Sequence, residues 1–219
     1  MKIAYSWLKK FVEIKLPAQK LAAGLTMAGL EVVGLEKQAG DFVFEIEITS
    51  NRPDWLSVLG VAREVSAIYG AKLKKPGLVA SKREIAAGAA LSISVTDPKD
   101  CPFYSGRVIT GVQVGPSPEW LQKDLAALGC RSVNNVVDIT NYCLFAFGQP
   151  LHAFDLDKLC QGRIKVRRAQ AGERLITIDG QARALDPGML VIADAQRPVA
   201  VAGIMGGLDT EVTPATRNI

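Results

Sequence analysis

Most side chains that could do chemistry lie in one twenty-residue stretch, VVDITNYCLFAFGQPLHAFD. It holds two acids, Asp138 and Asp155, the pair Thr140 and Asn141, and His152, the only histidine of the chain. A hydroxyl, an amide and an imidazole that converge can hold a polar ligand and a water molecule. The alternative is a capped helix end with a structural histidine, and the residues by themselves leave both interpretations open.

A second stretch, VAVAGIMGG at 199–207, is rich in glycine. Three glycines in five residues let a backbone approach a ligand closely and present N–H donors, which suits a carboxylate, an ester or a ribose. A tight turn between packed strands explains the same residues equally well. The spacing is neither that of a dinucleotide-binding loop nor that of a P-loop, and no G-x-S-x-G nucleophile elbow occurs.

A third candidate is the sequence Asn51-Arg52-Pro53-Asp54. Arg52 either binds a phosphate or belongs to a structural turn with an internal pair between Arg52 and Asp54. The residue types do not decide between these roles.

Composition narrows the class of protein. The 219 residues carry 26 Lys and Arg against 22 Asp and Glu, a net charge of +4 that is only a weak indication of nucleic-acid contact. No apolar run approaches the about 20 residues of a membrane helix, and the start lacks the apolar core of a signal peptide. We therefore expect a cytoplasmic protein without a membrane partner. The four cysteines are expected to be reduced and half-buried, and one histidine makes a metal site improbable.

Hydrophobic periodicity predicts the elements that must position these residues. The expected helices cover 6–12, 17–28, 57–71, 116–128 and 133–147. The expected strands cover 2–5, 30–35, 42–49, 91–95, 104–114, 162–168, 174–178, 190–193 and 199–204, with a hairpin turn at Asp179-Gly180. In the last helix Val136, Thr140 and Cys143 share a face, and the break at 148–150 would return His152 over that helix.

These elements predict an α+β fold with two domains. A small α/β domain covers 1–72, a linker rich in Pro, Gly and Lys covers 73–90, and a larger α+β domain covers 91–219. The sequence stops where an apolar run begins, and we therefore expect a fragment whose second domain is incomplete.

Four stretches carry a resemblance to a known family. They are MKIAYSWLKKFV, EIEITSNRPDWLSVLGVAREVSAIYG, VVDITNYCLFAFGQPLHAFD and AGIMGG. In this order they resemble the N-terminal region of the β subunit of bacterial phenylalanyl-tRNA synthetases, and the similarity runs through essentially the whole chain.

The resemblance implies a part of an (αβ)2 enzyme that joins phenylalanine to tRNA(Phe). Its α subunit performs the synthesis, and the whole enzyme uses ATP and Mg²⁺, with no cofactor expected in this region. Residues 1–72 would be a scaffold with tRNA contacts. Residues 91–219 would be most of an editing domain that hydrolyses tyrosine wrongly attached to the tRNA.

The resemblance also implies site residues. His152 and Thr140 would orient the ester and a water molecule. The substrate-binding residues would be Arg131, Asn141, Pro150, Ala202 and Gly203. No strong general base is evident, so positioning would supply most of the rate.

The sequence departs from the family pattern in two respects, and two alternative functions remain open. Many family members insert an oligonucleotide-binding barrel in the scaffold, but the passage from Gly34 to Phe42 leaves no room for it. The family acid that recognises the tyrosine hydroxyl would lie beyond Ile219. The alternatives are a non-catalytic scaffold for tRNA or protein with a vestigial pocket, and a free-standing trans-editing hydrolase, which would not need residues 1–72.

Overall fold

The computed structural model describes residues 1–74, 76–77 and 90–219. The chain forms two compact units, one from Met1–Val79 and Pro116–Leu151, the other from Ala80–Gly115 and His152–Ile219. Most of the predicted linker, 73–90, lies outside the described residues. Where it begins, Leu73 pairs with Val12, so this end of the segment belongs to the first unit.

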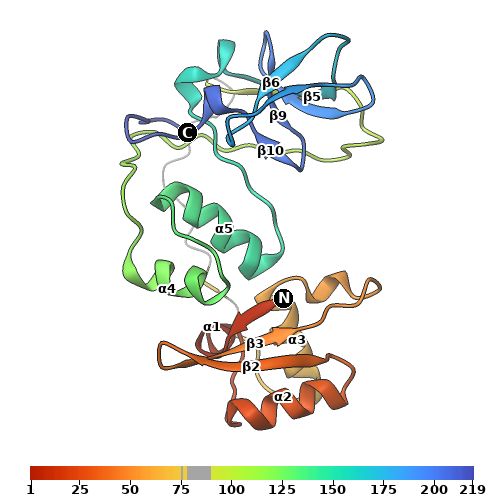
Figure 1. Ribbon diagram of the computed structural model, residues 1–219, viewed down its shortest axis with the longest axis vertical. Coiled ribbons are helices and arrows are strands. Elements are labelled where there is room, and N and C mark those ends of the chain that lie inside the picture. The colour runs from red at the N-terminus through yellow and green to blue at the C-terminus, as the bar shows by residue number, and fades with distance from the viewer. Residues whose placement is uncertain (75, 78–89) are drawn as a thin grey trace. The chain divides into compact units, whose positions relative to one another are not determined.

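The first unit combines five helices with a three-stranded antiparallel sheet among its described residues (Figure 1). Its strands are β1 (Lys2–Ala4), β2 (Val32–Gln38) and β3 (Asp41–Ile46), in the order β1-β3-β2. Its helices are α1 (Tyr5–Phe11), α2 (Ala18–Met27), α3 (Val58–Tyr69), α4 (Glu119–Ala127) and α5 (Asn135–Phe147), with a short 3-10 turn η1 (Pro53–Trp55) before α3.

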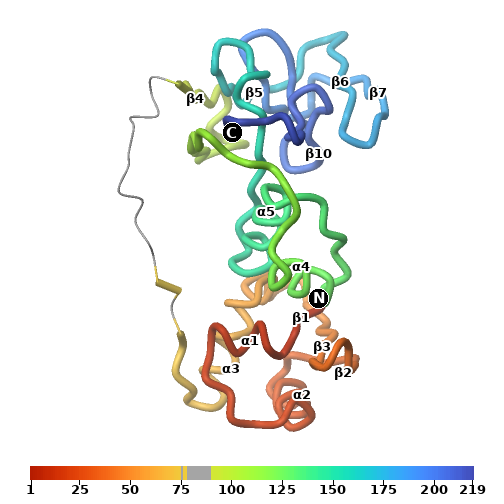
Figure 2. The backbone as a smooth tube through the Cα atoms, turned by 90° about the vertical axis from the view of Figure 1, so that its left-hand side faces the viewer, coloured from red at the N-terminus to blue at the C-terminus, as the bar shows by residue number. Residues whose placement is uncertain are grey.

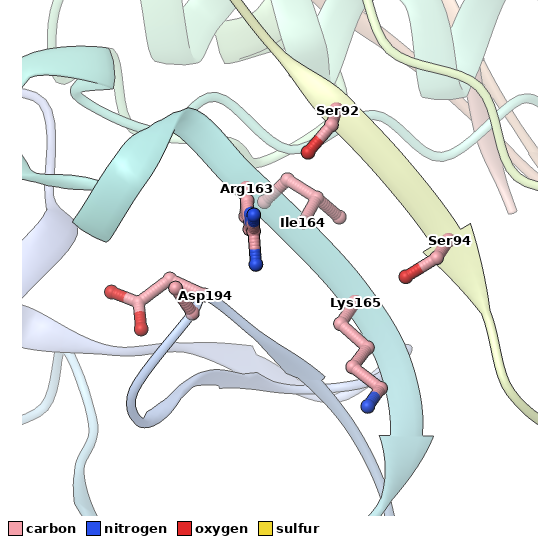
Figure 3. Close-up of a pocket in the computed structure, with 7 residues that line it drawn as sticks. Ser92, Ser94, Arg163, Ile164, Lys165 and Asp194 are labelled. Atoms are coloured by element: carbon pink, nitrogen blue, oxygen red, sulfur yellow. The ribbon is translucent and has the colours of Figure 1, made fainter.

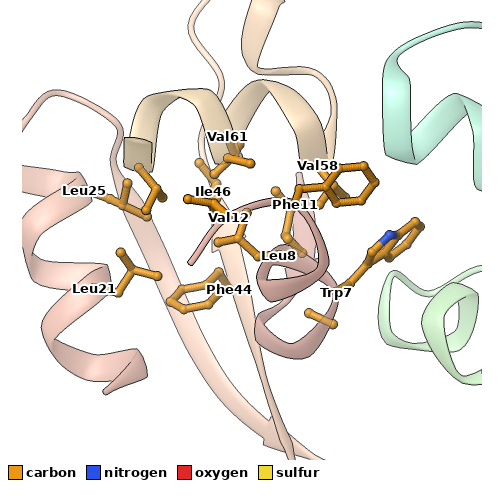
Figure 4. Packing of buried hydrophobic residues seen from close by; sticks show 14 of the residues in the cluster. Trp7, Leu8, Phe11, Val12, Leu21, Leu25, Phe44, Ile46, Val58 and Val61 are labelled. Carbon is orange, nitrogen blue, oxygen red and sulfur yellow. The ribbon is translucent and has the colours of Figure 1, made fainter. Parts of the chain in front are cut away.

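One hydrophobic core joins these elements. Leu21 and Leu25 lie one turn apart on α2, and alternate residues of β3, Phe44 and Ile46, point to the same side. Figure 4 shows these side chains meeting those of α1 and α3. Burial of this apolar surface is the main stabilising term of the first unit.

The loop between β2 and β3 has two residues, Ala39 and Gly40. Their φ angles, 47° and 84°, are both positive, as in the hairpin turns whose twist matches that of the strands. Gln38 pairs directly with Asp41 across the turn. The prediction that no further domain is inserted at this point is confirmed.

Helices α4 and α5 pack on the start of the chain. The ring of Trp7 stacks on Tyr142 with centroids 4.9 Å apart, and Phe11 meets Phe147 edge-to-face. Lys10 pairs with the carboxylate of Asp124 at 2.6 Å. The compact units therefore do not follow the predicted division into 1–72 and 91–219, because these two helices bury aromatic rings against α1.

The second unit is mostly β-structure. Its strands are β4 (Ser92–Val95), β5 (Arg163–Arg168), β6 (Arg174–Ile176), β7 (Ala182–Ala184), β8 (Leu190–Ala193), β9 (Pro198–Val201) and β10 (Met205–Gly206). Five of them form a sheet in the order β10-β9-β8-β5-β4, while β6 and β7 form a separate hairpin. The pair β4 and β5, side by side in Figure 2, is parallel, and the other pairs of that sheet are antiparallel. Three short 3-10 turns complete the unit, namely η3 (Leu156–Lys158), η4 (Cys160–Gly162) and η5 (Leu208–Thr210).

The fold is mixed α/β, and three local expectations were wrong. The segment 104–114 is irregular rather than a strand, because Gly111 takes a φ of +69° and only Thr110 forms a bridge, with Asn218. Strand β7 was not predicted, since its three residues are all exposed and show no alternation. Helix α1 covers Tyr5–Phe11 rather than the expected 6–12. In the part of the chain that the structure describes, no helix is both long and apolar enough to cross a membrane.

Candidate functional site

The predicted site residues divide between the two units. The first unit holds Arg131, Thr140, Asn141 and Pro150. The second holds His152, Ala202 and Gly203. Their convergence on one pocket therefore stays a prediction, and each group is described within its own unit.

Helix α5 positions Thr140 and Asn141. The side chain of Asn134 caps the helix by accepting the N–H of Val137 at 2.9 Å, and Gly148 ends it with a φ of +73°. The Thr140 hydroxyl donates to the carbonyl of Val137 at 2.6 Å. Because that bond uses its only proton, the Thr140 oxygen is free to accept a hydrogen bond but not to donate one.

The other predicted residues of the first unit differ in exposure. Asn141 is half-buried, whereas Arg131 and Pro150 are exposed. Arg131 lies in the segment that leads into α5, and Pro150 follows the helix end at Gly148. Both flank the helix that carries Thr140, as the sequence predicted.

The two acids of the VVDITNYCLFAFGQPLHAFD stretch are structural. Asp138 is fully buried and accepts hydrogen bonds from the Ser117 hydroxyl at 2.5 Å, the Ser132 hydroxyl and the Val133 N–H at 2.9 Å. Burial by itself raises the pKa of Asp138, but these three donors outweigh it and hold the pKa below its ordinary range. Asp138 therefore ties the segment before α5 to the helix.

Asp155 likewise holds the C-terminal segment of the chain in place. It is buried, and its carboxylate accepts the Thr216 hydroxyl at 2.7 Å and the N–H of Asp157 at 3.2 Å. Its own N–H donates to the carbonyl of Thr210. Neither acid is thus available as a free general base.

His152 sits on an exposed segment with its ring held from two sides. It meets Phe154 edge-to-face at a centroid distance of 4.5 Å. A Cβ added to Gly206 would stand 2.4 Å from His152 Cε1, so the ring lies directly over that glycine. Although the residue is exposed, this packing removes water from part of the ring and lowers the pKa of His152 below its ordinary value of 6.5. This packing therefore favours the neutral form of the imidazole.

Ala202 and Gly203 form the turn between β9 and β10. The N–H of Ile204 donates to the carbonyl of Val201 at 3.0 Å, and Gly203 takes a φ of +70°, which favours glycine. Gly203 is exposed, and a Cβ there would meet no atom within 4 Å. The backbone of this turn is open to a ligand, whereas Ala202 packs on the cluster that contains Phe154.

Two residues of this group were not among the predicted ones. Phe154 fixes the edge of the His152 ring, and Gly206 provides the floor beneath it. Both stood inside the two stretches that the sequence marked. His152 and Phe154 are two positions apart in the sequence, and their rings meet edge-to-face.

Arg52 has a structural role. Its guanidinium donates to Asp54 at 3.0 Å and 2.9 Å and to Glu64 at 3.0 Å. It also stacks on Trp55, 3.5 Å from the ring centroid. The interpretation of residues 51–54 as a turn with an internal pair between Arg52 and Asp54 is confirmed. The contacts with Asp54 and Glu64 account for the positive charge of Arg52.

Comparison with known proteins identifies the domain that contains these residues. A model of the B3/4 domain family matches residues 100–219, more than half of the chain. The chain belongs to the B3/4 domain family. All seven predicted site residues lie within the B3/4 match.

Curated relatives of this B3/4 chain confirm the resemblance. The phenylalanine–tRNA ligase beta subunit of Moorella thermoacetica is 54% identical over 189 residues, covering 86% of the chain and 23% of that protein. The beta subunit of Rhodopirellula baltica is 44% identical over 219 residues, covering all of the chain and 32% of that protein. The chain thus spans about a quarter to a third of the length of these relatives.

A solved structure shares the fold. The crystal structure of an N-terminal fragment of the phenylalanyl-tRNA synthetase beta subunit from Pyrococcus horikoshii matches all of the chain and 65% of that fragment. Its TM-score is 0.52 at 17% sequence identity. At this identity the likeness concerns the fold alone.

Proposed function

We propose that this chain is a region of the β subunit of a phenylalanyl-tRNA synthetase and contributes its hydrolytic editing site for Tyr-tRNA(Phe). The observation that carries the proposal is the imidazole ring of His152, held between Phe154 and Gly206 within the B3/4 match. A neutral imidazole has one donor and one acceptor nitrogen, so it can orient a water molecule or a ribose hydroxyl beside an ester.

The need for such a site follows from the chemistry of the two amino acids. Tyrosine differs from phenylalanine by one hydroxyl, and an apolar pocket rejects an added hydroxyl by only about a hundredfold. A second site that binds the hydroxylated side chain and cleaves its ester separates the two in the opposite sense.

We assign the remaining residues by what they can offer. The exposed backbone of Gly203 would approach the substrate, with Ala202 beside it. Thr140 would accept a hydrogen bond from water or from the substrate amine, since its proton is already engaged. Asn141, Arg131 and Pro150 would line the substrate. With both acids engaged, positioning of ester and water would supply most of the rate.

The rest of the activity would belong to the whole enzyme. The chain would act with an α subunit in an (αβ)2 assembly and with tRNA(Phe), and ligation would use ATP and Mg²⁺. Among the described residues, no three His, Cys, Asp or Glu side chains gather into a metal-binding group.

Selective deacylation tests the proposal. Tyr-tRNA(Phe) and Phe-tRNA(Phe) are incubated separately with the synthetase assembly that carries this region, and loss of each ester is followed. We expect faster hydrolysis of the tyrosyl ester. Binding of both RNAs with no hydrolysis above the spontaneous rate would instead support the non-catalytic scaffold.

A further inference from the structure

The second unit has a small polar pocket formed by residues other than those of the proposed editing site. Its volume is about 320 Å³, and Figure 3 shows its lining. Ser92 and Ser94 come from β4, Arg163 and Lys165 from β5, and Asp194 from the end of β8. The pocket lies at the side of the sheet where β4 is the last strand.

The strand register brings two hydroxyls and two cations together. In the parallel pairing of β4 with β5, Ser92 lies opposite Arg163 and Ser94 opposite Lys165. Alternate residues of a strand share a face, so all four side chains project from the same side of the sheet. All four are exposed, whereas Ile164 between the two cations is buried.

The cations of this pocket have no acidic partner in the part of the chain that the structure describes. Among the residues that the structure describes, neither Arg163 nor Lys165 forms an ion pair. Arg167, the next residue on the same face, offers a contrast, because Glu173 binds its guanidinium through two hydrogen bonds of 2.9 Å and 2.6 Å. The pocket therefore keeps two positive charges, while the rest of the strand is neutralised.

Asp194 also lines the pocket, and among the described residues it forms no ion pair with either cation. It is buried, and its carboxylate accepts the N–H groups of Cys160 at 3.1 Å, Gln196 at 2.8 Å and Arg197 at 2.9 Å. These three donors stabilise the carboxylate and hold the loop after β8 in place, and with two cations against one acid the lining keeps a net positive charge. Its role is to shape the wall of the pocket.

We propose that this pocket binds a phosphate group of the tRNA backbone. Arg and Lys side chains together with hydroxyl donors are the groups that contact nucleic-acid phosphates. The cations stand exposed at the edge of a sheet rather than around a buried ion, which suits a phosphodiester within a chain that passes along the surface. The inference rests on the proposed function, since the RNA is that of the proposed substrate, and it adds a second contact in the unit that holds His152.

The test compares tRNA(Phe) binding by the full chain across a series of salt concentrations. Arg163→Ala with Lys165→Ala removes both cations, and Lys99→Ala with Arg174→Ala is the matched control in the same unit. We expect the slope of log K against log salt to fall by about 1.5 for the pocket variant and to change little for the control. Exchanging the two cations, Arg163→Lys with Lys165→Arg, should preserve the slope.

A second variant distinguishes loss of the phosphate contact from a folding defect. Ser94→Glu keeps both cations and adds a negative charge at an exposed position, so it should weaken tRNA binding by several fold, with an unchanged melting temperature. Equal slopes for the pocket and control variants would overturn the proposal. Binding of inorganic phosphate that depends on Arg163 and Lys165, with tRNA binding unchanged, would also overturn it in favour of a free-anion site.

The outcome is separable from that of the editing proposal. At saturating RNA the pocket variant should deacylate Tyr-tRNA(Phe) at the wild-type rate, because it contains His152 unaltered. A changed salt slope with no hydrolysis by wild type would retain the phosphate contact and reject editing. Hydrolysis by wild type with an unchanged salt slope for the pocket variant would retain editing and reject the phosphate contact.

Discussion

His152 is the side chain on which the proposed chemistry depends. It is the only imidazole of the chain, and imidazole is the only side chain whose ordinary pKa lies close to neutrality. Its contacts with Phe154 and Gly206 leave one part of the ring open to solvent and strip water from the other. The residue thus joins exposure, which a substrate needs, with a fixed ring orientation.

A proton NMR titration of the single histidine tests this environment. The lowered pKa predicts a midpoint below 6.5. The unfolded chain then takes up the proton first as pH falls, so the free energy of unfolding should decrease below about pH 6.5. In a His152→Ala chain this part of the pH dependence should vanish. A midpoint at or above 6.5 would show that the ring is not desolvated.

Asp138 should matter for stability. Asp138→Asn replaces an oxygen that accepts hydrogen bonds with an N–H₂ group that faces donors, leaving buried polar groups unpaired. We expect the free energy of unfolding to fall by about 2–3 kcal/mol, measured by urea denaturation near pH 7. Because the pKa of Asp138 is lowered, its contribution is present above its ordinary pKa of 3.8 and is lost as pH falls through its folded value.

Glu119→Gln is the matched control for Asp138→Asn. Its carboxylate lies in the same unit, is exposed and stands 3.7 Å from Lys123. An exposed pair of this kind contributes well under 1 kcal/mol. Similar losses for the two variants would contradict the assignment of Asp138 as a buried clamp.

Residue types marked candidate site residues in the sequence, but they did not mark the hydrogen-bond partners of the two acids. A lone histidine beside Thr140 and Asn141 was visible in the sequence. The structural roles of Asp138 and Asp155 were not, because their hydroxyl donors Ser117 and Thr216 stand 21 and 61 positions away along the chain. Such pairings are fixed by tertiary folding and leave no local pattern.

Elements with strong local signals were predicted well. The Ser57 cap starts α3, Pro17 precedes α2, and Gly148 ends α5, each by a local hydrogen bond or backbone preference. The prediction of a strand over 104–114 was wrong because the β-forming residues there are interrupted by Gly106 and Gly111. Gly106 packs closely on β4, since a Cβ there would stand 2.7 Å from the terminal methyl of Ile93.

Gly206→Ala tests how β10 supports the site. The new Cβ would overlap the His152 ring, which can move only by rotating away from its position. We expect Tyr-tRNA(Phe) deacylation to fall by roughly tenfold or more, with about 1 kcal/mol lost from the free energy of unfolding. Gly115→Ala is the matched control, since a Cβ there would meet no atom within 4 Å.

A double-variant cycle identifies the cause of that loss. If Gly206→Ala acts through the ring, it should have little further effect on deacylation in a His152→Ala background. Full additivity of the two substitutions would mean that Gly206 acts elsewhere in the unit.

At the scale of the molecule, the two compact units are discontinuous in sequence. Helices α4 and α5 present apolar side chains that any neighbouring surface could cover, so periodicity does not say which one they choose. The stacking of Trp7 on Tyr142 and the pair of Lys10 with Asp124 decide it for the first unit. The B3/4 match, which includes both helices, therefore spans parts of both units.

The most direct test of the central claim separates ester hydrolysis from ligation in the proposed (αβ)2 assembly. The measurement is the ratio of Tyr-tRNA(Phe) deacylation to phenylalanine attachment for wild type, for His152→Ala and for Gln170→Ala, an exposed control in the same unit. We predict that His152→Ala lowers this ratio by roughly tenfold to a hundredfold through deacylation alone, while the control stays at the wild-type value. An unchanged ratio for His152→Ala would contradict the editing site.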